Sequence, residues 1–274
     1  MDFELLAKKY RRAYSFENHD RPLIRICTKK DNAPLTAPPK APDILRDRWL
    51  DLEYVIKNSR YNIERTAYLG EAYPHAWINF GPDIMGAICG CDIEFGDITS
   101  WAIHDGRALA DYGDIVFDPG NEWFKRLDEY TKALADDSRG DYAIGITDLH
   151  PGMDAIVSLR GPENTCFDLI ECPETVKKVN FQIFEVYKKV YEAQYNAATK
   201  YMPFISHWLY TLCDDRNYVT SCDFSCMIST DDFQEFVMPE LAEEIHYFDT
   251  SILLFILRTI CPRRGISHRT DAFA

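Results

Sequence analysis

The sequence predicts an α/β fold with a parallel sheet, because short apolar runs alternate with longer amphipathic segments. The runs of strand length cover residues 77–82, 142–147, 204–209 and 218–221. Between them, the hydrophobic side chains recur at helical spacing, most clearly in residues 122–136 and 173–200. Strands that alternate with helices in this way are typical of parallel sheets.

The N-terminal part of the chain differs in texture from the rest. Residues 1–20 are charged and predict a helix, whereas five prolines in residues 21–43 exclude a regular helix there. We therefore expect residues 1–44 to be an extension with a proline-rich arm. Residues 43–68 predict one long helix, and residues 95–118 predict a loop with a hairpin.

Composition limits the classes of partner. The net charge of −14 argues against nucleic acid and against an anionic membrane surface, both of which attract clustered Lys and Arg. No run of about 18 apolar residues predicts a membrane span. The nine cysteines are odd in number and show no disulfide framework, and no signal peptide opens the chain, so we expect a cytoplasmic protein.

Residues 217–245 contain the most informative segment. A predicted strand, 218–221, leads into the polar residues Cys222 and Asp223, and a helix follows that Ser229 or Thr230 can cap. In α/β folds, side chains that follow the ends of parallel strands face the ligand.

The helix in this segment carries Phe233, Phe236 and Pro239 as Phe-x-x-Phe-x-x-Pro, and it resembles the uroporphyrinogen decarboxylase family. The resemblance covers roughly residues 45–250 and implies a TIM-type barrel domain. It implies cofactor-free decarboxylation of a tetrapyrrole-type acid, and a homodimer. The family also contains corrinoid-linked methyltransferases, so methyl transfer from a methyl donor with a corrinoid protein as partner is an alternative. An inactive barrel or binding scaffold is a third reading.

The chain departs from the family pattern in three places. Arg21 and Arg25 have the spacing of the family's carboxylate-binding arginines but not their context. No histidine has a cysteine two positions later, so we expect no metal, and the methyltransferase alternative requires that its zinc site was lost by truncation. Residues 251–274 do not continue the family pattern, so we expect an aberrant tail and a barrel that is incomplete at its C-terminus. A frameshift in the gene would explain this tail, and sequencing the locus would test it.

Candidate site residues follow the predicted strands. Asp223, His150 and Asp148 are the expected catalytic residues, because carboxylates beside a histidine can perform acid–base chemistry near neutral pH. Asp223 and Asp148 could instead cap helices, and Trp208 could be a packing residue. The expected substrate-binding residues are Asn79, Asp154, His207, Trp208 and Cys222.

Overall fold

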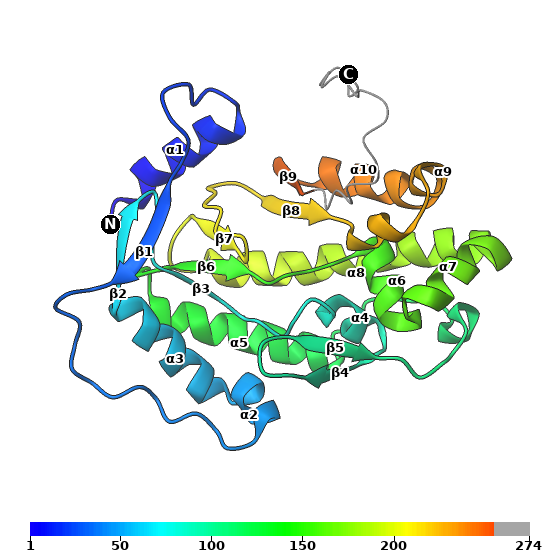
Figure 1. Cartoon of the computed structure of the whole chain (residues 1–274), viewed down its shortest axis with the longest axis horizontal. Helices are drawn as coiled ribbons and strands as arrows, with labels where there is room; N and C mark the ends of the chain where they lie inside the picture. Colours follow the sequence, from blue (N-terminus) through cyan, green and yellow to red (C-terminus); the bar gives the residue numbers. More distant parts are fainter. Residues whose placement is uncertain (255–274) are drawn as a thin grey trace.

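The computed structural model describes residues 1–254 and has the parallel α/β organisation that the sequence predicts (Figure 1). Three parallel strands, in the order β3-β6-β7, form the central sheet: β3 (His75–Trp77), β6 (Ala143–Ile146) and β7 (Ile205–His207). Strands β8 (Asn217–Ser221) and β9 (Thr250–Leu254) form a separate parallel pair. Within residues 1–254 the strands form no closed barrel; the prediction was of a TIM-type barrel that is incomplete at its C-terminus.

Helices pack beside this sheet and build the main hydrophobic core. The long helices α5 (Glu122–Ser138) and α8 (Pro173–Ala198) contact each other and β6. Buried apolar side chains such as Ile144 and Ile146 of β6 join those of the two helices in one cluster. The shorter helices are α4 (Ile84–Cys89), α6 (Gly152–Arg160) and α7 (Pro162–Glu171). Burial of this apolar surface is the main stabilising term for the sheet–helix arrangement.

The N-terminal helix α1 (Phe3–Tyr14) packs on the sheet through a second, smaller core. Its buried face meets Tyr73, Ala143 and Phe204, which come from three separate segments near the sheet. Farther along, β1 (Arg25–Lys29) pairs antiparallel with β2 (Thr66–Gly70). The arm between residues 21 and 43 thus contains a strand, as well as the extended chain that its prolines require.

The prediction of one helix over residues 43–68 is wrong in two places. The chain forms α2 (Leu45–Leu50) and α3 (Leu52–Glu64), separated at Asp51, and residues 66–70 belong to β2. The Asp51 side chain accepts a hydrogen bond from the Tyr54 N–H at 2.9 Å, so it starts a new helix. Aspartate favours this N-cap position over a helix interior.

The expected hairpin is present as β4 (Asp92–Phe95) and β5 (Ser100–Ile103), and the 3₁₀ helix η1 (Leu109–Tyr112) follows it. After β8 the chain forms the 3₁₀ helix η2 (Asp223–Met227), the helical turn α9 (Thr230–Asp232), the π-helical turn η3 (Phe233–Val237) and α10 (Met238–Tyr247). Ser229 caps α9 by accepting the Asp232 N–H at 3.1 Å, as predicted. Strand β9 crosses residue 250, where we expected the barrel domain to end and the aberrant tail to begin. The predicted frameshift concerns residues outside those described.

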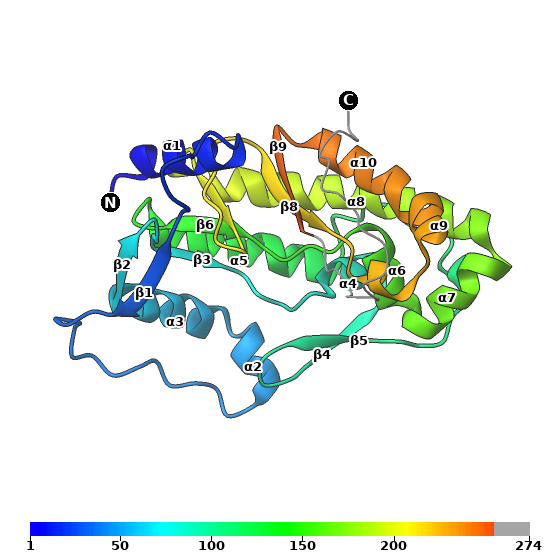
Figure 2. The same cartoon turned by 45° about the horizontal axis from the view of Figure 1, so that its top comes forward.

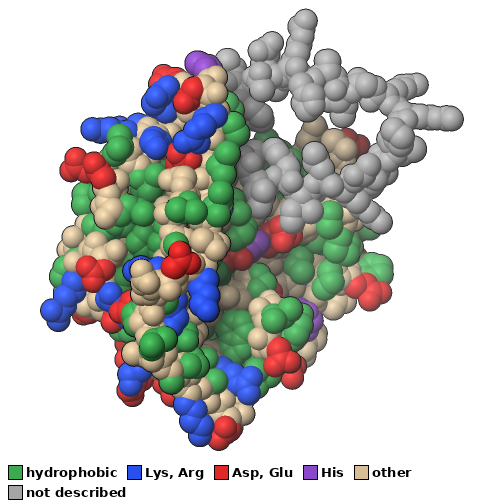
Figure 3. All heavy atoms as spheres, turned by 60° about the vertical axis from the view of Figure 1, so that its left-hand side comes forward, with side chains coloured by type: hydrophobic (Ala, Val, Ile, Leu, Met, Phe, Trp, Pro, Cys, Tyr) green, Lys and Arg blue, Asp and Glu red, His purple; other side chains and the backbone are tan. Residues whose placement is uncertain are grey.

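The surface carries charges of both signs. Figure 3 shows Lys, Arg, Asp and Glu side chains over the outer parts of one face, which is hollowed near its centre. Among the helices of residues 1–254, none combines the length and hydropathy that a bilayer crossing requires.

Candidate functional site

A cleft of about 240 Å³ lies where the chain leaves β3, β6 and β8. It is lined by Pro82, Asp83, His150, Asp154, Val157, Ser158, Asp223, Phe224 and Met227. Pro82 and Asp83 follow β3, His150 follows β6, and Asp223 begins η2 shortly after β8. Figure 2 shows the chain that leaves β8 passing beside α6. The carboxyl ends of parallel strands commonly form ligand sites in α/β folds.

His150 lies between two carboxylates. Its Nδ1 is 3.2 Å from Asp154 Oδ2, and its Nε2 is 2.9 Å from Asp148 Oδ1. The first contact is a well-aligned hydrogen bond, whereas the second is a close ionic contact without that alignment. Burial lowers the pKa of His150, but the two carboxylates outweigh burial and raise the pKa well above its ordinary value. The imidazole is therefore protonated at neutral pH.

Asp154 joins the exits of two strands. Its two carboxylate oxygens accept the backbone N–H groups of Asp223 and Phe224, each at 2.8 Å. The Cys222 thiol lies 3.8 Å from the same carboxylate, and burial raises the pKa of that thiol well above its ordinary value. The thiol is thus protonated rather than a ready nucleophile.

Asp223 is the exposed member of the group, with its carboxylate at the cleft. Partial burial raises its pKa, the positive charge of His150 opposes that shift, and the negative charges of Asp154 and Asp148 add to it. The site therefore combines one imidazolium with several carboxyl groups. Such a group can donate a proton to a bound substrate or hold a cationic one.

Two buried glutamates lie behind the cleft on α10. Glu240 and Glu244 are 4% and 1% exposed, and one carboxyl oxygen of each has no hydrogen-bond partner within residues 1–254. Burial raises the pKa of Glu244 to about 8, although Tyr187 and the charge of His150 oppose the shift. Burial and the charge of Glu244 raise the pKa of Glu240 well above its ordinary value. Both carboxyl groups are therefore mainly protonated at neutral pH.

Gly152, the first residue of α6, makes room for the Glu240 side chain of α10. Its φ is +65°, and a Cβ placed on it would lie 2.5 Å from Glu240 Oε2. Only glycine meets both demands without strain.

Three ligand-type atoms in the cleft are close enough for one cation. Atoms of His150, Asp154 and Asp223 all lie within 4.8 Å of one another. In the arrangement described, the His150 proton hydrogen-bonds Asp154, and a metal would have to displace it. The zinc set implied by the family resemblance, His-x-Cys with a distant Cys, does not fit this cluster, which includes no thiolate.

The structure brings together five of the predicted site residues: Asp148, His150, Asp154, Cys222 and Asp223. Asn79 does not line the cleft, since its Oδ1 accepts the Gly81 N–H at 2.9 Å and braces the turn after β3. Trp208 does not line it either.

His207 also lies apart from the cleft. It is fully buried, and its Nε2 lies 2.9 Å from the Asn217 carbonyl, while its Nδ1 contacts Thr211 Oγ1. Burial lowers the pKa of His207 to about 4, so the ring is neutral. Its position therefore favours a structural role for this histidine.

Sequence reasoning missed Asp83, Ser158, Glu240 and Glu244. Ser158 Oγ donates to Asp83 Oδ1 at 2.5 Å, at the cleft wall. One signal was present in the sequence, because Glu240 and Glu244 continue the helical spacing of the apolar positions Phe236 and Val237. Glutamates on the buried face of an amphipathic helix point to a buried acid pair.

Comparison with protein-family models gives no match, and comparison with curated proteins gives none either. The fold is similar to a solved structure described as a methyltransferase from Methanosarcina mazei. The TM-score is 0.59 and 12% of the aligned residues are identical; the match covers 91% of this chain and 69% of the other. The chain therefore has a distantly methyltransferase-like fold.

Proposed function

We propose that this protein is a methyltransferase whose active site is the cleft at His150, and that it acts on a small-molecule methyl donor. The observation that carries the proposal is the protonated His150 held between Asp148 and Asp154 at the strand exits. The similarity in fold to a methyltransferase supports the same reading. The acceptor that we propose is a corrinoid protein partner.

In this proposal, His150 is the general acid. When the methyl group passes to the acceptor, the bond between the methyl carbon and its oxygen, nitrogen or sulfur breaks, and that atom keeps the electron pair. When the donor is neutral, that atom then needs a proton, whereas a cationic donor leaves as a neutral molecule without one. His150 supplies the proton from Nε2, because Nδ1–H is engaged by Asp154 and Nε2 has only the poorly aligned contact with Asp148. Asp154 is a positioning residue that fixes the imidazole.

The decarboxylase reading receives less support from the cleft. A tetrapyrrole-type acid carries several carboxylates, which arginines or lysines would bind. Within residues 1–254, the charged side chains that line the cleft are three aspartates and one histidine. This lining suits a neutral or cationic methyl donor better than a polyanion.

The test uses reduced cobalamin as the acceptor and methanol, methylamines and methyl thioethers as donors. The formation of methylcobalamin is measured by its absorbance. We expect transfer from at least one class of donor, and a loss of roughly 10²–10⁴-fold in rate in His150→Gln. His19→Gln is the matched control, because His19 is exposed and lies far from His150 in the sequence. Absence of transfer from every donor, or equal rates in His150→Gln and the unchanged protein, would refute the proposal and favour a binding scaffold.

A further inference from the structure

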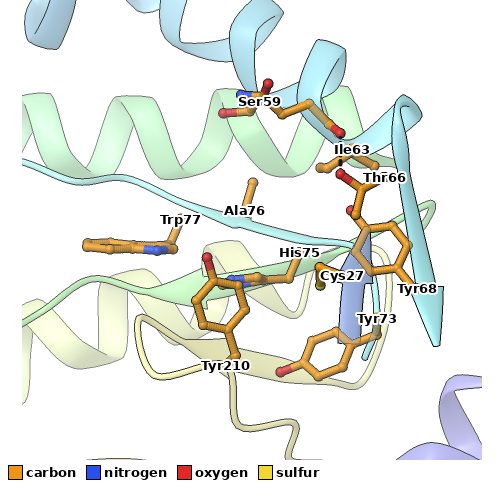
Figure 4. Close-up of a pocket in the computed structure, with 11 residues that line it drawn as sticks. Cys27, Ser59, Ile63, Thr66, Tyr68, Tyr73, His75, Ala76, Trp77 and Tyr210 are labelled. Atoms are coloured by element: carbon orange, nitrogen blue, oxygen red, sulfur yellow. Dashed lines mark hydrogen bonds between the residues drawn. The ribbon is translucent and has the colours of Figure 1, made fainter. Parts of the chain in front are cut away.

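A second cavity, of about 310 Å³, lies between α3, the antiparallel pair of β1 and β2, and β3. It shares no lining residue with the cleft at His150. Its volume is in the range of small-molecule sites. Figure 4 shows the side chains that line it, including Tyr68, Tyr73, Trp77 and Tyr210 around His75.

His75 is a buried polar residue that lines this cavity. The residue is 9% exposed, and neither ring nitrogen has a hydrogen-bond partner within residues 1–254. Burial, with the nearby positive charge of Arg25, lowers the pKa of His75 to about 3. The ring is therefore neutral at physiological pH and offers one N–H donor and one acceptor nitrogen. A buried polar group without a partner is costly, and because the Tyr210 ring covers His75, a ligand reaches these nitrogens when that ring moves aside.

The cavity walls are uncharged, and they combine aromatic rings with the polar side chains of Ser59, Asn62 and Thr66. Its lining residues include four aromatic rings and none of the Asp, Glu, Lys or Arg side chains within residues 1–254, although the protein carries a net charge of −14. The Tyr73 hydroxyl is engaged with Ser206 Oγ at 2.7 Å, which leaves its ring as a wall. Such a lining favours a flat, neutral ligand over an ion.

Tyr210 covers His75 in a strained conformation. The two ring centroids are 4.0 Å apart and the ring planes meet at 69°. Tyr210 has a φ of 60°, which is costly for a residue with a Cβ. Arg25 holds this turn, since its Nη1 donates to the carbonyls of Tyr210 at 2.6 Å and Leu209 at 3.2 Å. These hydrogen bonds hold the Tyr210 backbone in this conformation, with its ring against His75.

From these contacts we propose that the cavity binds a neutral aromatic compound that carries an N–H or O–H group, with the rings of Trp77 and Tyr210 beside it and His75 accepting its hydrogen bond. The site is independent of the proposed methyl transfer. Indole is a suitable probe, because it is neutral and bicyclic and has one N–H. Its methylated form, 1-methylindole, has nearly the same shape without the donor.

Binding of the two probes to the full chain is measured by NMR titration. We expect indole to bind at least tenfold more tightly than 1-methylindole, and we expect His75→Leu to abolish this difference. Because the substitution removes a buried group without a partner, His75→Leu should also raise the melting temperature. Tyr210→Ala should weaken indole binding at least fivefold. The matched control is Tyr201→Ala, since Tyr201 is 46% exposed against 45% for Tyr210 and lies outside the cavity.

Three outcomes would overturn the proposal: no indole binding up to its solubility, equal affinity for the two probes, or unchanged affinity in Tyr210→Ala. If His75→Leu does not fold, the probe comparison and Tyr210→Ala still decide. Because the assay contains no cobalamin or methyl donor, its failure is separate from failure of the methyltransferase proposal.

Discussion

The Asp154 carboxylate accepts the backbone N–H of Asp223 at 2.8 Å, and this contact links the exits of β6 and β8, which belong to different sheets. The same carboxylate holds the His150 ring. One buried side chain thus positions both halves of the proposed site, so its loss should affect stability and activity together.

Replacement of Asp154 by Ala should lower the free energy of unfolding by about 3 kcal/mol, because it leaves two backbone N–H groups and the His150 ring without their partner. Urea unfolding followed by circular dichroism measures this loss. The control is Asp136→Ala, which removes an exposed ion pair with Lys200 and should cost less than about 1 kcal/mol. Equal losses in the two variants would show that Asp154 does not join the strand exits.

Gly152→Ala should destabilise the protein by roughly 3 kcal/mol, since the new Cβ would clash with Glu240 and the positive φ adds strain. Gly106→Ala separates the two causes, because Gly106 also has a positive φ, of +80°, and has nothing within 4 Å of a Cβ. Thermal unfolding of both variants is the measurement. A loss in Gly152→Ala no larger than that in Gly106→Ala would contradict the close contact of Gly152 with the Glu240 side chain.

The raised pKa of Glu244 predicts a pH dependence of stability. The folded protein keeps the Glu244 proton up to about pH 8, whereas the unfolded chain releases it near 4.5. Between these values the folded state binds more protons, so stability falls as pH rises, by at most about 1.4 kcal/mol per pH unit for one group.

Urea unfolding between pH 5 and pH 8 tests this. Glu244→Gln, which cannot ionise, should flatten the decline, whereas Glu243→Gln, at an exposed position of the same helix, should leave it unchanged. The same slope in all three proteins would mean that Glu244 ionises normally in the folded state.

The lowered pKa of Glu71 predicts that stability falls as the pH decreases in the acid range. It is fully buried, and hydrogen bonds from Arg21, the Ile24 N–H and Lys9 lower its pKa to about 2. Its contribution to stability is complete above pH 4.5 and is lost as pH falls towards 2. Glu71→Gln should therefore unfold at lower urea at pH 6 and lose less stability on acidification than the unchanged protein. Glu64→Gln, at an exposed residue, is the control, and parallel acid profiles for Glu71→Gln and the unchanged protein would be the contrary result.

Local signals predicted much of the fold. The strand at 218–221 and the Ser229 cap are visible in the sequence because strand hydrophobicity and capping are properties of neighbouring residues. Strand β2 was missed, because residues 66–70 are half-buried or exposed and pair only with the distant β1. Pairing between remote segments leaves little trace in a short window.

Part of the site was also predictable from local signals in the sequence. Asp148, His150 and Asp223 follow strands, and that rule alone brought them together. His207 also ends a strand, yet its side chain points to the Asn217 carbonyl rather than to the cleft. Which face a strand residue takes depends on the register of pairing, since a shift of one residue reverses every side chain.

The division between β7 and β8 has a kinetic consequence. The two sheets share no ladder, and His207 reaches across to the Asn217 carbonyl beside an isolated bridge between Ile205 and Cys213. The β8–β9 pair can therefore open as a cooperative unit of its own, with its amide protons exchanging earlier than those of β6. Because Asp223 follows β8, each opening of the β8–β9 pair would separate Asp223 from His150. The frequency of this opening would determine what fraction of the molecules has the proposed site assembled.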